Sequence, residues 1–291
     1  MFIAGIDGGG THTRIELRDM ENRTIRRGEF GPFNINSIGA EAFRALLREV
    51  FGWCGDMADC ARLCVGGAGI SNPMASQILA EELERAGFRG LWKLCGDQEI
   101  ALRGTVEGSG VVVIAGTGSI CFGKNAAGET ARSGGYGHLI DDCGSGYALG
   151  RDVLSSAVRS IDGRVKGSGI LAAVCERLDG GPERIVPFVY SPKTDKAAIA
   201  DFALIALKLA EQGDREAQAI LDREAGELAG MVRAVQESLE MPGCPIALLG
   251  GLMSSDNPYR RTVTETLGKL GTVIEPGHDA LWGAAQMAYE L

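Results

Sequence analysis

The chain has 291 residues, of which 45% are hydrophobic and 23% charged, and its formal net charge is −9. At roughly 150 residues per domain this length predicts about two domains, and the composition excludes a mainly disordered protein. The acidic balance lacks the basic surface that nucleic acids and anionic membranes attract, so we expect neither as a partner. No apolar run has the length of a membrane helix and no basic signal-peptide region is present, which predicts a cytoplasmic protein.

The eight cysteines and three histidines form no recognisable metal-binding or disulfide pattern. No Cys-x-x-Cys pair occurs, and no histidine has the spacing to cysteine of a zinc site. Isolated cysteines in a chain of this size behave as small buried hydrophobic residues. We therefore predict buried free cysteines and no structural metal cluster.

The 43 glycines, about twice the usual share of roughly 7%, gather after short apolar runs. A first predicted strand, residues 2–6, leads into residues 7–11, Asp-Gly-Gly-Gly-Thr, and alternation over residues 13–18 predicts a second strand. The glycines thus close a hairpin, unlike the strand-to-helix turn of a Rossmann fold or P-loop. Such a loop offers backbone N–H groups to a phosphate. An acidic residue such as Asp7 is compatible with phosphate binding if a Mg²⁺ ion lies between its carboxylate and the phosphate. A tight turn with Asp7 as a turn residue explains this single loop equally well.

Helices and strands then alternate along the chain. Periodicity predicts helices over residues 41–51 and 75–86, separated by a strand over residues 62–65. Ser71 or Asn72 is the expected N-cap of the second helix.

Asp97 follows the next predicted strand, residues 91–95, and opens another helix. It either caps that helix or acts as a general base that removes a proton from an alcohol attacking a phosphoryl group. Nothing in the local sequence decides between these roles.

A second glycine cluster repeats the first arrangement. A buried strand over residues 111–114 leads into residues 115–119, Ala-Gly-Thr-Gly-Ser, and residues 120–122 extend again. Two strand–glycine–strand hairpins suggest an internal duplication and favour phosphate binding over a chance pair of turns. A domain boundary near Thr117 follows from this interpretation.

The remaining segments are a functional loop and a mainly helical region. Residues 134–146 are too rich in glycine and polar residues for a core, and Asp142 there can cap a helix that begins near Ser145. The later segments comprise a proline-interrupted stretch (residues 180–194), two helices (197–212 and 214–239) and a third apolar-to-glycine junction (245–255) that leads into a helix over residues 257–267.

Six motifs occur together in one order: residues 5–11, 34–37, 96–97, 115–119, 134–146 and 249–251. In this order they resemble the sugar kinases of the actin/Hsp70/hexokinase superfamily. Within it the chain is similar, over nearly its whole length, to the BadF/BadG/BcrA/BcrD ATPase family, which contains N-acetylglucosamine kinase.

The resemblance implies an α/β fold of two RNase H-like domains with a central nucleotide cleft. The first domain is expected over residues 1–117 with the first phosphate loop and the sugar site. The second is expected over residues 118–277 with the adenosine site, and a final helix over residues 278–291 returns to the first domain. A homodimer is also implied.

The resemblance further implies ATP and Mg²⁺ as cofactors and assigns roles to residues of this chain. The phosphate contacts are Gly9, Gly10, Thr11, Thr117 and Gly118, the adenosine contacts are Gly250, Gly251, Ser254 and Ser255, and the magnesium ligand is Asp7. The sugar contacts are Asn34, Asp97, Ser119, Ile120, Gly135, Tyr136, Gly137 and Asp142. Asp97 matches the general base, which would act on the 6-hydroxyl of N-acetylglucosamine.

Departures from the family pattern leave the amino sugar open. Tyr136 stands where N-acetylglucosamine kinases often have tryptophan, and residues 141–143, Asp-Asp-Cys, replace a more usual Gly-Asp-Glu. Glucosamine and muramic acid therefore stay alternative substrates.

Two other classes of protein remain. An ATPase that activates a dehydratase or reductase needs a cluster cysteine before its Gly-Thr-Gly signature, where this chain has Ile114 and Ala115. A non-catalytic sugar sensor would lose the base or the phosphate loops, whereas Asp7, Asp97 and Thr117 are all present.

Overall fold

The computed structural model describes all 291 residues and contains two compact units. The first comprises Met1–Gly108 with Pro276–Leu291, and the second comprises Ser109–Glu275. The boundary predicted near Thr117 is therefore too late. Strand β6 (Gly110–Ala115) hydrogen-bonds to β7 (Ser119–Lys124) and β9 (Gly243–Leu249), so the whole second hairpin belongs to the second unit. The returning segment likewise begins at Pro276, two residues before the predicted start.

The first unit is a five-stranded mixed sheet in the order β3-β2-β1-β4-β5. Its strands are β1 (Phe2–Gly8), β2 (Thr13–Arg18), β3 (Thr24–Phe30), β4 (Cys60–Gly67) and β5 (Leu91–Gly96). The predicted first hairpin is confirmed, because β1 pairs antiparallel with β2. β4 and β5 run parallel to β1, so the carboxyl ends of these three strands share one edge of the sheet.

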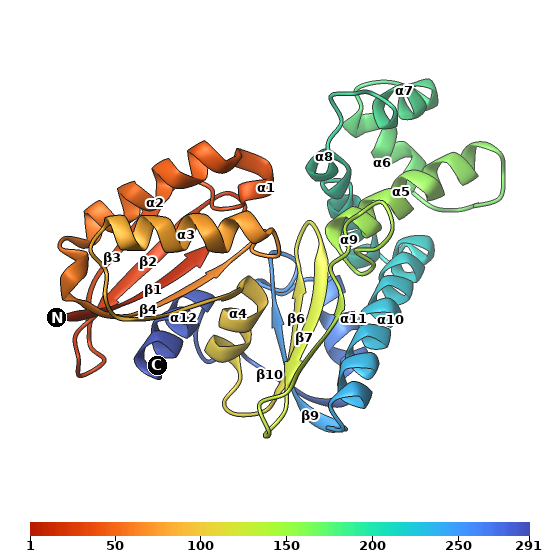
Figure 1. Cartoon of the computed structure of the whole chain (residues 1–291). Helices are drawn as coiled ribbons and strands as arrows, with labels where there is room; N and C mark the ends of the chain where they lie inside the picture. The colour runs from red at the N-terminus through yellow and green to blue at the C-terminus, as the bar shows by residue number, and fades with distance from the viewer. The chain divides into compact units, whose positions relative to one another are not determined.

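Helices cover both faces of this sheet (Figure 1). Its helical elements are α1 (Ile35–Ile38), α2 (Ala40–Cys54), the 3-10 turn Met57–Asp59, α3 (Pro73–Arg85), α4 (Asp97–Thr105) and α12 (Ala280–Tyr289). The apolar sides of α2 and α3 bury one face and those of α4 and α12 bury the other. Asn72 is the N-cap of α3, which selects one of the two predicted caps.

Small residues allow α12 to lie directly on the first sheet. A Cβ atom at Gly5 of β1 would lie 2.2 Å from the backbone nitrogen of Ala285, and one at Gly283 would lie 2.0 Å from the carbonyl oxygen of Ile100. Only glycine permits such close backbone contact. The last segment of the chain is therefore an integral part of the first unit.

The second unit repeats the strand order of the first. Its sheet has the order β10-β9-β6-β7-β8. If its five strands are numbered 1 to 5 along the chain, this order read from the β8 edge is 3-2-1-4-5. The first sheet has the same order, 3-2-1-4-5. The further strands are β8 (Thr130–Gly134) and β10 (Gly271–Ile274). This repetition confirms the expected α/β fold built on a duplicated hairpin.

The second unit also carries a large helical region. Its helical elements are α5 (Gly146–Ile161), α6 (Ile170–Arg177), the 3-10 turn Pro182–Arg184, α7 (Ile185–Val189), α8 (Lys196–Ala200), α9 (Ala203–Glu211), α10 (Arg215–Ser238) and α11 (Pro258–Leu267). The single helix predicted over residues 197–212 is instead the pair α8 and α9, and the stretch over residues 180–194 holds two short helical turns. α10 packs along β6, β7 and β8 and forms the centre of this core.

Two sequence expectations concern buried and membrane-like segments. Six of the eight cysteines are buried, and Cys143 and Cys175 are half-buried. None of the helices combines the length and the apolar character that a membrane crossing requires.

Candidate active site

The turn between β1 and β2, residues 9–12 and hereafter loop 1, presents unused backbone donors. It is closed by a hydrogen bond of 2.8 Å from the Gly9 N–H to the His12 carbonyl, while the N–H groups of Gly10 and Thr11 donate to no acceptor in the protein. A Cβ atom at Gly10 would meet nothing within 4 Å. Loop 1 therefore has the open backbone donors that a phosphate-binding turn needs.

Asp7, at the end of β1, is paired with Arg14 across the hairpin. The two residues are register partners, and the Arg14 Nη2 atom lies 2.6 Å from the Asp7 Oδ2 atom. Burial raises the pKa of the Asp7 carboxyl, and the hydrogen bond from Arg14 opposes that rise. Sequence reasoning missed Arg14, although hairpin pairing around a four-residue turn places it opposite Asp7.

Asp97 lies at the same sheet edge, directly after β5. Strand register aligns Asp7 on β1 with Gly66 on β4 and Cys95 on β5, two residues before Asp97. Gly96, not Asp97, is the N-cap of α4, so the predicted capping role is wrong. Burial raises the pKa of the Asp97 carboxyl, and the negative charge of Asp7 raises it further. A half-buried carboxylate with a raised pKa is suited to accept a proton.

Asn34 belongs to the same end of the first unit. The Phe33 N–H donates to the Gly9 carbonyl at 2.9 Å, which fastens the Asn34 segment to loop 1. The Asn34 side-chain oxygen caps α1 by accepting from the Asn36 N–H at 3.0 Å. Its amide nitrogen makes no hydrogen bond within the protein, and this leaves a donor for a ligand.

The turn between β6 and β7, residues 116–118 and hereafter loop 2, is the counterpart of loop 1. The Gly116 N–H donates to the Gly118 carbonyl at 2.9 Å, and the N–H groups of Thr117 and Gly118 have no acceptor in the protein. The first turn of α5 is hydrogen-bonded to the loop, since the Gly146 N–H donates to the Gly116 carbonyl at 2.8 Å. Loop 2 is thus a second set of open backbone donors.

The predicted adenosine turn adjoins loop 2 within the second unit. Gly250 has a φ of +99°, and a Cβ atom there would lie 2.3 Å from the carbonyl oxygen of Ala115. The Ser254 hydroxyl donates to the Gly251 carbonyl at 3.0 Å, and the Ser255 carbonyl accepts from Asn257 at the start of α11. Both predicted serines therefore shape the turn.

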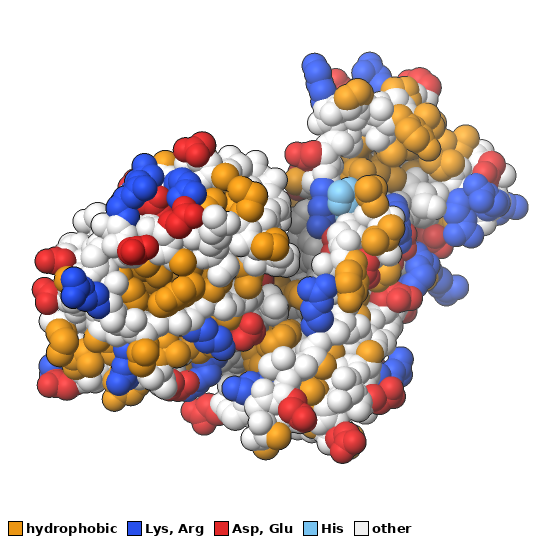
Figure 2. Space-filling view, in the orientation of Figure 1, with side chains coloured by type: hydrophobic (Ala, Val, Ile, Leu, Met, Phe, Trp, Pro, Cys, Tyr) orange, Lys and Arg blue, Asp and Glu red, His pale blue; other side chains and the backbone are white.

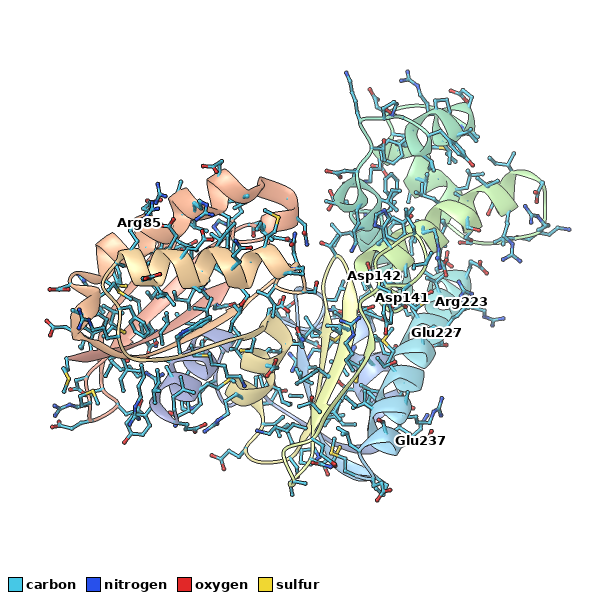
Figure 3. All side chains as sticks on the ribbon, viewed as in Figure 1. Arg85, Asp141, Asp142, Arg223, Glu227 and Glu237 are labelled. Carbon is cyan, nitrogen blue, oxygen red and sulfur yellow. The ribbon has the colours of Figure 1, made fainter.

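Asp142 carries its carboxylate to loop 2 and meets a lysine that sequence reasoning missed. It is buried, and its backbone is left-handed with a φ of +61°. Its Oδ1 atom accepts from the Ser119 N–H at 3.4 Å, and its Oδ2 atom lies 2.6 Å from the Lys196 Nζ atom. Ser145, rather than Asp142, is the N-cap of α5, which corrects that expectation. Figure 3 labels Asp141 and Asp142 on the loop before α5.

The other predicted sugar contacts lie at the start of β7 and on residues 135–137, and their side chains differ in how exposed they are. The Ser119 hydroxyl donates to the Cys143 carbonyl at 2.6 Å, and Ile120 packs against Gly135. Tyr136 is 62% exposed, with the Arg132 guanidinium 4.7 Å from its ring centre. Gly135 and the following Gly137 both have positive φ, which permits the sharp path of this loop.

Gly144 is held on both sides by buried side chains from the helices behind the loop. The Glu224 carboxylate on α10 accepts from the Gly144 N–H at 2.6 Å, and the Tyr259 hydroxyl on α11 donates to the Gly144 carbonyl at 2.8 Å. Burial raises the pKa of Glu224 to about 7. Figure 3 labels Arg223 and Glu227 on the same helix; both line a charged pocket with Cys143. Glu224 and Tyr259 lie 80 and 115 residues from Gly144 in the sequence, and no local pattern reveals such distant contacts.

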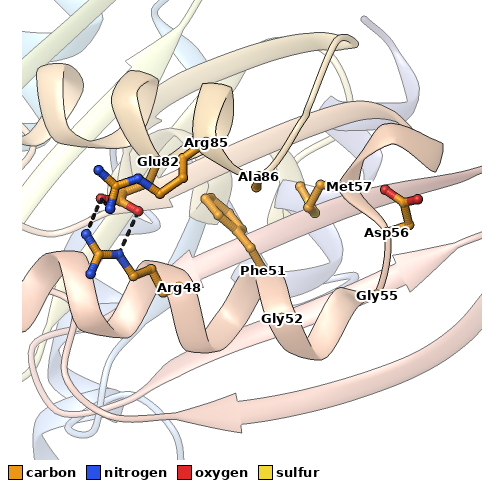
Figure 4. Close-up of a pocket in the computed structure, with 9 residues that line it drawn as sticks. All are labelled: Arg48, Phe51, Gly52, Gly55, Asp56, Met57, Glu82, Arg85 and Ala86. Carbon is orange, nitrogen blue, oxygen red and sulfur yellow. Dashed lines mark hydrogen bonds and ion pairs between the residues drawn. The ribbon is translucent and has the colours of Figure 1, made fainter.

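A separate pocket in the first unit has a structural explanation. Its volume is about 280 Å³, and Figure 4 shows the Arg48 guanidinium paired with Glu82 at its rim. The Arg48 Nε atom lies 2.9 Å from Glu82, and this hydrogen bond lowers the pKa of that buried carboxyl. Charged side chains gather over α2 and α3 in Figure 2. None of the predicted site residues lines the pocket, and its ion pairs join α2 to α3.

Comparison with known proteins decides the family. The model of the BadF/BadG/BcrA/BcrD ATPase family matches residues 4–288. The chain belongs to this family. It is 31% identical to the N-acetylmuramic acid/N-acetylglucosamine kinase of Clostridium acetobutylicum, over 99% of this chain and 98% of that protein. It is 27% identical to the N-acetyl-D-glucosamine kinase of Dictyostelium discoideum, over 82% of this chain and 80% of that protein.

A solved structure supports the same assignment. The chain resembles a protein of Chromobacterium violaceum described as an N-acetylglucosamine kinase, with a TM-score of 0.79 and 25% identity. The match covers 99% of this chain and 98% of that one. The expected family and the two-unit α/β fold of actin-like ATPases are therefore confirmed for this BadF/BadG/BcrA/BcrD family member.

The residues near loop 1 fit a magnesium ion bound together with ATP. No group of three or more acidic, histidine or cysteine side chains is placed to hold a metal alone. Mg²⁺ in kinases is usually held by one or two carboxylates together with waters and substrate phosphates. The Asp7 Oδ1 atom is not used by Arg14, so Asp7 can supply such a carboxylate oxygen.

Proposed function

We propose that this family member is an ATP-dependent amino-sugar kinase that phosphorylates the 6-hydroxyl of N-acetylglucosamine. The observation that carries the proposal is the half-buried Asp97 carboxylate, which shares a sheet edge with loop 1 and has a raised pKa. Family membership and the names of the two curated relatives support kinase activity. Eight unpaired cysteines suit the reducing cytoplasm, where we expect the enzyme to act.

In the proposed reaction Asp97 removes the proton of the sugar hydroxyl. The hydroxyl oxygen forms a bond to the γ-phosphorus of ATP as the bond from that phosphorus to the β–γ bridging oxygen breaks. ADP leaves with the electron pair of the broken bond, and the proton remains on Asp97 until solvent accepts it. The raised pKa of Asp97 makes it a stronger base than an exposed aspartate.

The open N–H groups of loop 1 and loop 2 are proposed to hold the phosphates of ATP. Such preorganised donors stabilise the charge that spreads over the transferring phosphoryl group. Magnesium, held through Asp7, would neutralise part of the phosphate charge. Gly250, Gly251, Ser254 and Ser255 are proposed to border the adenosine.

Asn34, Asp142 and Tyr136 are among the residues proposed to contact the amino sugar. Asn34 offers its free amide nitrogen, and Asp142 offers a carboxylate beside Ser119. The exposed Tyr136 ring is proposed to cover a face of the sugar. The Clostridium relative is named for N-acetylmuramic acid as well, so that sugar is the second candidate acceptor.

A coupled assay of ADP release tests the proposal. Wild-type protein with Mg·ATP is screened against N-acetylglucosamine, glucosamine, N-acetylmannosamine, N-acetylmuramic acid and glucose. We expect slow ADP release alone and a strong increase with N-acetylglucosamine, because the base has no hydroxyl to act on until sugar binds. Fast ADP release that no sugar alters would refute a sugar kinase.

A further inference from the structure

Lys196 places a positive charge against loop 2. Its Nζ atom lies 2.6 Å from the Asp142 Oδ2 atom and 2.8 Å from the position that a Cβ atom at Gly118 would take. The side chain is 30% exposed, so the ammonium is not sealed in the core. All three residues belong to the second unit.

The backbone that carries Lys196 is fixed by close helix packing. Lys196 is the first residue of α8, and α8 lies so close to α5 that a Cβ atom at Gly150 would fall 2.0 Å from the Ile199 carbonyl oxygen. The Asp195 carboxylate caps α8 by accepting from the Ala198 N–H at 2.8 Å. The fold therefore fixes the backbone of Lys196 near loop 2, and the ion pair with Asp142 holds its ammonium there.

The ammonium has donors left over after its pairing with Asp142. A lysine ammonium carries three N–H donors, and the structure uses one of them on Asp142. Thr117 and Gly118 of loop 2 contribute two backbone N–H groups without acceptors. Together these groups place an ammonium and two free backbone N–H donors beside one another; the Asp142 carboxylate balances part of the ammonium charge, and donors of this kind match a phosphoryl group.

We propose that the Lys196 ammonium binds the γ-phosphoryl group of ATP and stabilises it during transfer. The inference rests on the proposed function, in which loop 2 contacts phosphate and Asp142 contacts the sugar. Lys196 touches both, and the group that passes between nucleotide and sugar is the γ-phosphoryl group. A positive charge there offsets the negative charge of the equatorial oxygens in the transition state.

A binding series separates this role from simple neutralisation of Asp142. Affinities for adenosine, ADP and a nonhydrolysable ATP analogue are measured by calorimetry on wild type, Lys196→Met and Lys196→Arg. Lys193→Met is the matched control, since it removes the same charge from an exposed residue three positions earlier.

The expected result is a selective loss for the ligand that carries a γ-phosphoryl group. Lys196→Met weakens binding of the ATP analogue about 10- to 100-fold, the size of a charge-assisted hydrogen bond, and leaves adenosine binding unchanged. ADP binding falls much less, Lys196→Arg recovers part of the ATP preference, and Lys193→Met matches wild type. Equal affinity ratios of ATP analogue to ADP in Lys196→Met and wild type would overturn the proposal.

A double variant completes the test. If Lys196 only neutralises Asp142, then Lys196→Met with Asp142→Asn regains the wild-type ATP affinity, which refutes the role; persistence of the loss supports it. The binding series needs no phosphoryl transfer. Failure of the kinase proposal can therefore be told apart from failure of this one. In that case Lys196→Met would still lose affinity for the ATP analogue, but no sugar would increase ADP release by the wild-type protein.

Discussion

Loop 1 and loop 2 occupy equivalent places in two units of the same strand order, yet their surroundings differ. Beside loop 1, Asp7 pairs with Arg14 of the same hairpin, seven residues later, and Arg14 also pairs with Asp279 of the returning segment. Loop 2 is surrounded by distant parts of the chain: Asp142, Lys196 and Gly250. Its flanking ion pair joins residues 54 positions apart.

The residues around the two loops therefore differ in chemical character. The first unit supplies acidic groups, Asp7 and Asp97, whose pKa values burial raises. The second unit supplies a lysine and a turn shaped by positive-φ glycines. In the proposed reaction Asp97 is the proton acceptor and Lys196 the phosphate-binding cation, and phosphoryl transfer needs both kinds of group.

The largest expected effect is at Asp97, the proposed base, which lies in the first unit. Asp97→Asn removes the basic oxygen, so kcat should fall about 10²- to 10⁴-fold while ATP affinity changes little. Because Gly96 caps α4, the fold should not depend on the carboxylate. Steady-state kinetics and calorimetry measure the two quantities.

The matched control for that substitution is Asp56→Asn, which changes an exposed capping aspartate of the same unit. It should retain the wild-type kcat. An Asp97→Asn protein with an unchanged melting temperature and at least half of the wild-type kcat would remove Asp97 from the role of base.

Alanine substitutions at the glycines beside the loops should differ in how much they lower the free energy of unfolding. Gly250→Ala combines a positive φ with a backbone oxygen at 2.3 Å, whereas Gly8→Ala meets the Phe33 ring, also at 2.3 Å. Neither a strand carbonyl nor the fully buried Phe33 ring can move away freely, so Gly250→Ala and Gly8→Ala should each cost about 1–3 kcal/mol of unfolding free energy. Urea unfolding measures both. Gly10→Ala and Gly251→Ala, with open space around them, serve as controls; equal losses in all four would contradict the packing described.

A smaller, pH-dependent effect is expected at Glu224, which supports Gly144 in the second unit. Burial raises the pKa of Glu224 to about 7 from an ordinary value of 4.5, so the folded protein binds the extra proton between these values. The free energy of unfolding should therefore fall as pH rises from about 4.5 to 7, by at most about 1.4 kcal/mol per pH unit. Arg151 and Asp152 of α5 face the same carboxyl and act in opposite directions on its pKa.

Glu224→Gln keeps an oxygen for the Gly144 N–H and removes the titration. Urea unfolding across this pH range should show a flatter dependence for the variant than for wild type. Parallel curves for the two proteins would show that Glu224 does not titrate in this window.

Sequence reasoning succeeded where the signal was local. Glycine-rich turns between short apolar runs predicted both hairpins, and Asn72 with Pro73 marked the start of α3. The predicted boundary between the units lies too late in the chain, because the amino-acid sequence of β6 does not show whether this strand belongs to the first sheet or the second. Sequence reasoning missed Lys196, Glu224 and Tyr259, whose partners lie about 55 to 115 residues away and which carry no local motif. Such contacts depend on helix packing, which periodicity does not encode.

Phosphorus NMR of the wild-type reaction with Mg·ATP and N-acetylglucosamine tests the central claim most directly. The account predicts that the γ-phosphorus signal of ATP is replaced by a phosphomonoester coupled to the C6 protons of the sugar, in step with ADP. Consumption of ATP that yields only inorganic phosphate, with the sugar unchanged, would contradict it.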